Sequence, residues 1–116
     1  MRFETLSDAE ILAIADPIMD NLMEASVAVD HARHTRDFTD RLKKIATPAH
    51  LEAVCKRYQA EKGFFAQRTF VAIFRRPGSA AIVWRQRFTR AEGDFVAEML
   101  LVETDSGCLV DHVMVF

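Results

Sequence analysis

The second half of the sequence constrains the fold most, because it reads as four consecutive β-strands with no helix between them. The segments 64–75, 80–89, 95–104 and 108–116 are rich in aromatic and β-branched residues, and short turns with Gly78, Gly93 and Gly107 separate them. The first half shows helical periodicity only. This order predicts an α+β fold, in which three N-terminal helices pack on one face of a curved four-stranded antiparallel sheet.

Length and charge limit the classes of protein that fit. At 116 residues, of which half are hydrophobic, the chain is expected to form one globular domain over residues 1–116. A net charge of −2 argues against partnership with nucleic acid or an anionic membrane surface. No leader and no stretch of about 20 apolar residues is present, so we expect a cytoplasmic protein.

The predicted helices have clear start and stop signals. Ser7 and Glu10 form a capping box before the first helix. Pro17 either bends this helix or stands in the first turn of a new helix that Asp16 caps. Asp30 is expected to cap a second helix that runs to about residue 44, with an apolar stripe of Phe38, Leu42 and Ile45. The third helix is expected to begin at Thr47-Pro48 and end at Gly63, with Leu51, Val54, Cys55 and Tyr58 on its apolar face.

Alternation along the strands predicts a register and two distinct faces. We expect Trp84 opposite Met99, Arg85 opposite Glu98, and Phe70 beside Trp84; the last hairpin then sets His112 beside Met99. The aromatic face, which we expect the helices to cover, would hold Phe70, Ala72, Phe74, Ile82, Trp84, Phe88, Phe95, Met99, Leu101 and His112. The other face would hold Val71, Ile73, Val83, Leu100, Val113 and Val115, with Arg85, Arg87, Glu98 and Asp111 among them.

The second face is too apolar for simple exposure to solvent. A symmetric sheet-to-sheet homodimer would cover it. The interface residues that we expect are Val71, Val83, Arg85, Glu98, Leu100 and Val113.

The order of these elements resembles the cystatin-like fold of the nuclear-transport-factor-2-like superfamily and its small bacterial domains. The resemblance lies in the Asp30, Phe38, Leu42 pattern, the TPAHLEAVCKRYQAEKG helix, the IVWRQRF strand and the closing EMLLVETDSGCLVDHVMVF hairpin. It implies a ligand cleft between the concave sheet face and the helices. It also implies either a binding or dimerisation module or an isomerase, cyclase or dehydratase that uses an Asp, His or Tyr in the cleft.

The candidate ligand-binding residues are the four strand residues that this register places in the cleft, together with Tyr58, whose hydroxyl the third helix would supply: Tyr58, Phe70, Trp84, Met99 and His112. His112 is the candidate catalytic residue, as a general base or as a partner for a polar group of the ligand. The alternative is a core histidine with a structural hydrogen bond. The environment of His112 discriminates between the two interpretations.

Other polar clusters are weaker candidates. His31 and His34 stand one helical turn apart, but no third metal ligand is marked, so a solvated helix face is the simpler interpretation. Arg85 and Arg87 fit either an anion clamp or a surface ion pair. The excess of basic residues over 31–90 neutralises acidic neighbours in the fold or lines a site for an anionic ligand.

Neither cysteine has the spacing of a metal or redox site, so we expect reduced core thiols. No cofactor or metal is expected. The sequence thus favours an uncharacterised, non-catalytic small-molecule-binding or dimerisation module with an apolar cleft. The alternative is a small isomerase, cyclase or dehydratase of the ketosteroid-isomerase-like type that uses His112, and a third interpretation is a purely structural dimer with no cavity.

Overall fold

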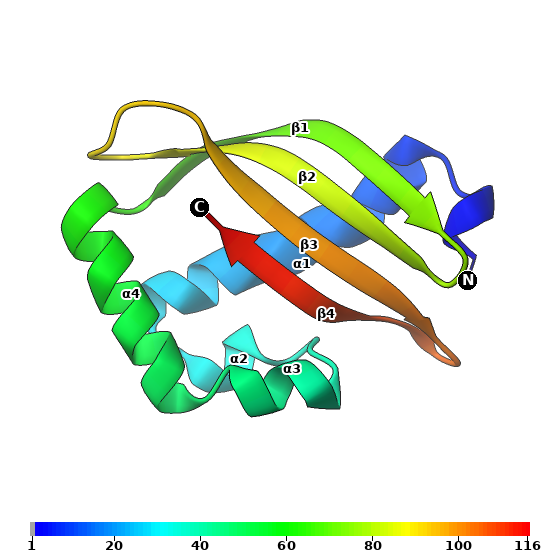
Figure 1. Ribbon diagram of the computed structural model, residues 1–116, viewed down its shortest axis with the longest axis horizontal. Coiled ribbons are helices and arrows are strands. Elements are labelled where there is room, and N and C mark those ends of the chain that lie inside the picture. The colour runs from blue at the N-terminus through cyan, green and yellow to red at the C-terminus, as the bar shows by residue number, and fades with distance from the viewer. Residues whose placement is uncertain (1) are drawn as a thin grey trace.

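The computed structural model describes residues 2–116 as helices followed by one antiparallel sheet (Figure 1). The elements are η1 (Phe3–Thr5), α1 (Asp8–Ala28), α2 (His31–His34), α3 (Asp40–Ile45), α4 (Pro48–Lys62), β1 (Phe65–Arg76), β2 (Ser79–Phe88), β3 (Phe95–Thr104) and β4 (Gly107–Val115). The strands pair in sequence order, β1-β2-β3-β4. The α+β class and the four-stranded meander are therefore confirmed, with four α-helices in place of the three expected.

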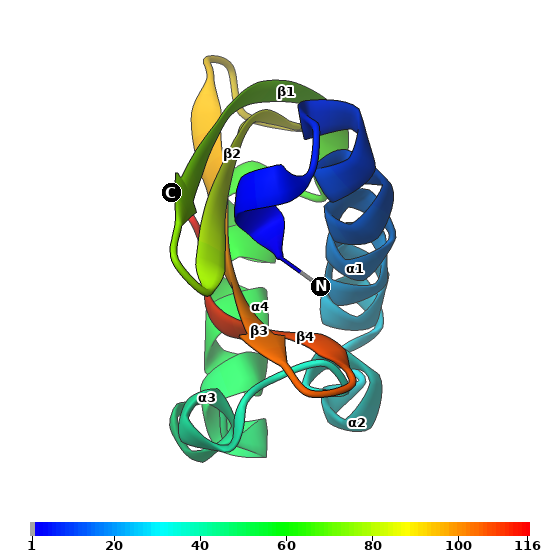
Figure 2. The same cartoon turned by 90° about the vertical axis from the view of Figure 1, so that its right-hand side faces the viewer.

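The helices are placed unequally around the sheet. Figure 2 shows α1 lying along one face of the sheet, with α2 and α3 near β4. In Figure 1, α4 stands beyond the end of β4, where the C-terminus lies. The sheet is thus covered by α1 over its middle, while its β4 edge faces α3 and α4.

The capping signals act as the sequence predicts. The Ser7 side chain accepts the Glu10 N–H at 3.1 Å, and the Glu10 carboxylate accepts the Ser7 N–H at 3.0 Å. Thr47 caps α4 ahead of Pro48. Pro17 lies inside a single helix, so it begins no new one. Gly63 ends α4 with φ of 84°, and a Cβ there would lie 2.3 Å from the Thr89 hydroxyl.

The expected single helix from Asp30 to residue 44 is wrong, because the chain leaves the helix between α2 and α3. Phe38 forms a parallel bridge with Val110 of β4, and Thr39 then caps α3 by accepting the Leu42 N–H. Tertiary pairing therefore overrides the helical pattern of this segment. Phe38 and Leu42 are buried as expected, but Ile45 is 55% exposed.

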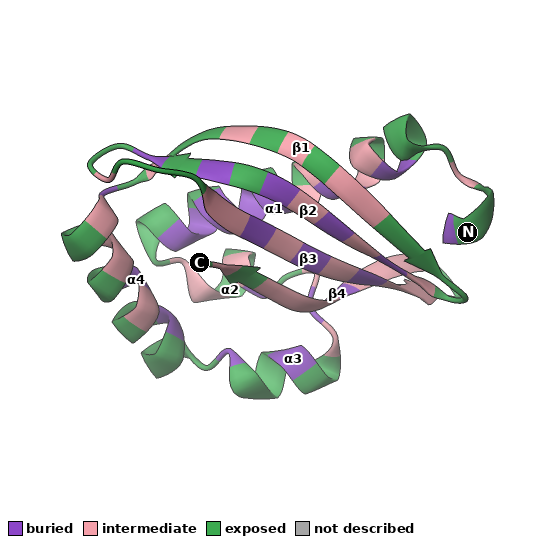
Figure 3. Cartoon of the chain, turned by 45° about the horizontal axis from the view of Figure 1, so that its top comes forward, coloured by how far each residue is buried: buried purple, intermediate pink, exposed green. Residues whose placement is uncertain are grey.

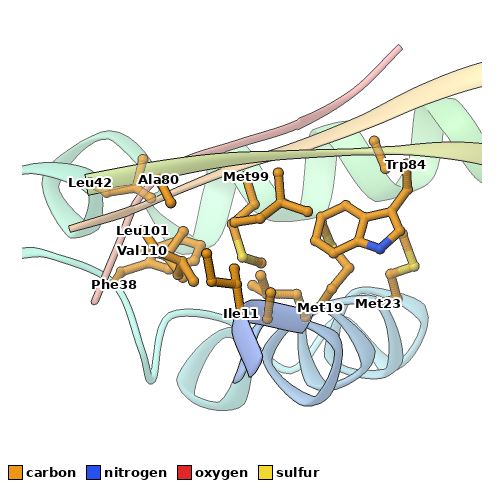
Figure 4. Close-up of a cluster of buried hydrophobic side chains, with 14 of the residues drawn as sticks. Ile11, Met19, Met23, Phe38, Leu42, Ala80, Trp84, Met99, Leu101 and Val110 are labelled. Atoms are coloured by element: carbon orange, nitrogen blue, oxygen red, sulfur yellow. The ribbon is translucent and has the colours of Figure 1, made fainter. Parts of the chain in front are cut away.

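The hydrophobic core fills the space between α1 and the inner face of the sheet. Figure 4 shows Ile11 and Met19 of α1 pointing toward Trp84, Met99 and Leu101 on the strands. The Trp84 indole N–H donates to the Asp16 carboxylate at 3.1 Å, which satisfies its only polar atom inside the core. Phe3 of η1 is also fully buried, a contact that the sequence did not reveal.

The predicted register between β2 and β3 is wrong by two residues. Trp84 pairs with Ala97, Met99 pairs with Ile82, and Glu98 pairs with Val83 and not with Arg85. A shift of two keeps every side chain on the same face. The buried positions along β2 and β3 therefore still alternate (Figure 3). The expected pairing of Phe70 with Trp84 is confirmed.

Three register shifts of one residue change the faces themselves: one in β1 between Phe65 and Arg68, one further along β1, and one in β4. In β1 the register slips at Val71, so Ile73 pairs with the buried Ile82, and Phe74 pairs with Ala81 and is 58% exposed. The predicted faces of these two β1 residues are reversed as a result. In β4 the slip falls between Val110, opposite Leu101, and His112, opposite Leu100. Asp111 is the extra residue there.

The two faces of β3 provide a direct test of this packing. Replacing Leu101 by Ala removes a fully buried side chain from the core, so we expect a loss of about 2–5 kcal/mol in the free energy of unfolding. Replacing its neighbour Leu100, which is only half-buried on the outer face, is expected to cost about 1 kcal/mol. Urea unfolding of both variants measures this, and equal losses would contradict the assigned faces.

Candidate functional site

The candidate site is a cleft of about 610 Å³ between α4, α3 and the C-terminal half of β4. Its walls are mainly apolar and come from α1, α3, α4 and the inner sheet face: Met19, Leu22, Met23, Phe38, Leu42, Leu51, Val54, Phe65, Phe88, Val113 and Val115. Ile45, Met114 and Phe116 also border it, and each is at least half exposed. The cleft is therefore open to solvent on one side.

The expected ligand residues divide between the cleft and the core. Tyr58 lines this cleft. Trp84 and Met99 are almost fully buried under α1, and Phe70 packs against the same core, so the space expected near them is filled. The cleft lies instead nearer β4 and α4, because α4 stands away from the sheet while α1 closes down on it.

A cluster of hydroxyl and thiol groups joins α4 to the end of α1 in the cleft wall. The Ser26 hydroxyl lies 2.9 Å from the Tyr58 hydroxyl and 3.2 Å from the Cys55 sulfur. Burial is the largest cause that raises the pKa of Tyr58 above its usual value. The phenol therefore stays neutral at physiological pH and can both donate and accept hydrogen bonds.

His34 is a half-buried histidine at the cleft wall. It borders the cleft and meets the Phe38 ring edge-on, with the centroids 5.3 Å apart. Burial, together with the nearby His31, lowers the pKa of His34 to about 4, so the ring is neutral at pH 7. Its Nδ1 atom is buried without a hydrogen-bond partner among residues 2–116. From the sequence, His34 is a candidate only as a metal ligand together with His31, and that candidate is weak.

The rim of the cleft carries more positive than negative charge. Arg41, Arg57 and Lys62 are among the described residues that line it, against the acidic Glu61. The Lys62 ammonium lies 4.9 Å from the centre of the Phe95 ring and 5.5 Å from that of Phe88. Arg41 pairs with Asp111 at 3.0 Å. Some of the basic residues from the 31–90 segment therefore lie at the cleft. This placement fits the interpretation in which they line a site for an anionic ligand.

The expected position of His112 in the aromatic face is wrong. The Asp111 bulge adds one residue to β4, so the His112 ring lies on the outer face, where Nε2 is 2.7 Å from the Glu98 carboxylate. His112 also borders the cleft, but its ring is held by this ion pair. By the same bulge, Val113 turns inward onto the core and lines the cleft, so the interface residue expected there points the other way.

The remaining candidates have ordinary structural partners. The His31 Nε2 bonds the Ala46 carbonyl at 2.7 Å, and no cluster of three metal-ligating residues occurs within residues 2–116. Arg85 and Arg87 both pair with Asp94, so they form surface ion pairs. Cys55 and Cys108 are free thiols. No helix in the described part of the chain combines the length and the apolar character needed to cross a bilayer.

Comparison with known proteins supports the fold and nothing finer. No family model matches the sequence, and no curated protein matches it. A structure of Bdellovibrio bacteriovorus Bd1075 superposes with a TM-score of 0.53 at 8% identity, over 95% of this chain and 42% of that one. A DUF4783 family protein from Bacteroides ovatus gives 0.48 at 11% identity, over 82% and 90%. This chain therefore spans less than half the length of the Bdellovibrio protein.

The buried His34 should make stability depend on pH. The pKa of His34 falls from 6.5 to about 4 on folding, so the unfolded chain binds the proton first as the pH drops. We expect the free energy of unfolding to be unaffected by His34 above pH 6.5. Between pH 6.5 and 4 it should fall by about 2 kcal/mol, once screening of the partly exposed ring is included.

The matched variant for this prediction is His34→Gln, which has no titrating ring. Urea unfolding of both proteins from pH 3.5 to 7.5 gives the difference in pH dependence, and an NMR titration of the His34 ring measures its pKa directly. Parallel stability curves, or a ring that titrates near 6.5, would show that His34 is not held neutral by burial.

Proposed function

We propose that this domain is a non-catalytic module that binds an apolar ligand in the cleft between α3, α4 and β4. The cleft itself carries the proposal: its volume of about 610 Å³ lies within the range of ligand pockets. Its mainly apolar walls, with Ser26, His34 and Tyr58 among the polar groups between them, are the composition typical of such pockets. The space around Trp84 is filled, which argues against a ligand there. The cleft beside α4 argues against the interpretation as a purely structural dimer with no cavity.

Acid–base catalysis is the less supported alternative. Its expected base, His112, pairs with Glu98 on the outer face. His34 is the histidine at the cleft wall, but a pKa of about 4 makes it a weak base at neutral pH, whereas general bases work best with a pKa near the operating pH. The neutral His34 ring, packed edge-on against Phe38, fits a part of the cleft wall better.

We further propose that the domain belongs to the cystatin-like, nuclear-transport-factor-2-like architecture and that it pairs through its outer sheet face. Helices laid against a curved antiparallel meander support the first point. Exposed apolar residues on the outer face support the second: Val71, Phe74 and Met114 are each at least half exposed, and Val83 and Leu100 lie among them. Cys55 and Cys108 as free thiols fit a reducing compartment such as the cytoplasm.

The ligand proposal is tested with an apolar fluorescent dye such as anilinonaphthalene sulfonate. Val54 lines the cleft, so Val54→Trp should fill part of it and weaken dye binding at least tenfold. Ala53 is its exposed neighbour outside the lining, so Ala53→Trp should change the affinity less than twofold. Fluorescence titration of the native protein measures both effects. No dye binding by the native protein, or equal binding by both variants, would refute the proposed site.

The dimer proposal is tested by placing a charge on the outer face. Leu100→Glu sets like charges against each other across a two-fold axis, so we expect the dimer dissociation constant to rise at least tenfold. Ala53→Glu, on the exposed side of α4, should leave it unchanged. Sedimentation equilibrium decides between the outcomes, and a monomeric native protein would refute the proposal.

A further inference from the structure

We infer that the ligand of the cleft is a short extended peptide that pairs with the free edge of β4, an inference that rests on the proposed binding function of the cleft. The class of ligand follows from the backbone groups that the cleft exposes. Apolar walls alone would accept many ligands. An unpaired strand edge in one wall selects a ligand with a backbone of its own.

The hydrogen bonds of β4 show which of its backbone groups face the cleft. Val96 of β3 and Phe116 exchange two backbone hydrogen bonds, at 2.6 and 2.8 Å. Bonded and non-bonded pairs alternate along an antiparallel ladder, so the pair next to them is non-bonded. Val113 and Val115, opposite Met99 and Ala97, therefore direct their N–H and C=O groups away from β3. Residues 112–116, which alternate between the two faces of the strand, all line the cleft, so the cleft lies along this edge.

The same edge already accepts an extended segment of this chain. The Thr39 N–H donates to the Val110 carbonyl at 2.9 Å, and the Val110 N–H donates to the Asp37 carbonyl at 2.7 Å. This parallel pairing stops where α3 begins at Asp40. The rest of the edge, from Val113 onward, borders the cleft and has no such partner among residues 2–116.

The opposite wall suits the side chains of an added strand. Leu51, Val54 and Tyr58 of α4 face the cleft from the far side. Successive side chains of a strand point to opposite faces, so every second side chain of the peptide would enter the apolar cleft and the others would face solvent. The edge over residues 113–116 spans about 13 Å, which matches a paired segment of about four residues.

Charge at the rim selects among such peptides. Arg41, Arg57 and Lys62 line the cleft. Arg41 is paired with Asp111, so Arg57 and Lys62 are set against Glu61 among the described residues of the lining. Acidic side chains on the solvent-facing positions of the peptide would therefore lie near positive charge. The inferred ligand is a peptide of alternating apolar and acidic residues in an extended conformation.

The first probe is a phage-displayed library of hexapeptides in which apolar and acidic residues alternate and the sequence is otherwise free. The best binder is then synthesised with capped termini and titrated against the protein. Two N-methylated forms of that binder serve as matched controls, because each blocks the donors on one edge of the extended peptide and keeps every side chain. We expect one form to bind at least tenfold more weakly and the other to change less than threefold. Equal affinities of the two forms would overturn strand pairing.

Amide hydrogen exchange provides a second readout that does not depend on a variant. The Val113 and Val115 amides should exchange at least tenfold more slowly with the capped peptide bound, whereas the Val96 amide, already bonded to Phe116, should not change. Val54→Trp should abolish the protection and Ala53→Trp should retain it. Unchanged exchange at Val113 and Val115 in the complex would overturn the inference.

The dye titration separates the two proposals. If the dye binds the cleft and the library yields no binder that Val54→Trp weakens, the peptide inference is wrong and the cleft remains a site for another apolar ligand. If neither the dye nor any peptide binds the native protein, both proposals are wrong. Peptide binding that the dye displaces supports both.

Discussion

The extra residue in β4, Asp111, is the constraint on which the rest of the candidate site depends. Thr39 donates to its carboxylate at 2.8 Å and Arg41 at 3.0 Å, and Arg41 also bonds its carbonyl. These hydrogen bonds hold the pKa of Asp111 below its usual value. They also fix α3 against β4. The bulge reverses the alternation of the residues after it, so His112 turns to Glu98 on the outer face while Val113 turns to the core and the cleft.

The cleft itself exists because α1 and α4 meet the sheet in different ways. α1 places a continuous apolar stripe on the sheet and closes the core around Trp84, with Asp16 satisfying the indole. α4 buries only Leu51 and Cys55. Its link to α1 runs through Ser26, which bonds both Tyr58 and Cys55. A helix held at a distance by polar contacts leaves room beside it, and that room lies along the β4 edge.

The sequence predicts the elements well and the faces less well, for a physical reason. Caps and turns are local signals, so Ser7, Thr47 and Gly63 mark the helix ends correctly. A register error of two residues keeps side chains on their faces, so the sequence places Trp84 and Met99 in the core correctly despite the wrong pairing. A bulge inserts a single extra residue and so reverses the alternation after it. No local sequence signal identifies Val71 or Asp111 as the extra residue. The alternation pattern therefore assigns Phe74 and His112 to the wrong faces, and it predicts a cleft beside Trp84 instead of beside α4.

The unmet hydrogen-bonding capacity of the cleft argues for an occupant more strongly than its volume does. Closing α4 onto β4 would bury the edge groups of Val113 and Val115 without partners, and each buried unpaired group costs about 1–3 kcal/mol. The apolar surface that α4 offers in return is small, since most of its residues are exposed. An occupant that carries its own donors and acceptors removes this penalty and covers the apolar walls as well. A peptide backbone supplies both kinds of group along an edge at the repeat of a strand, which an apolar small molecule does not.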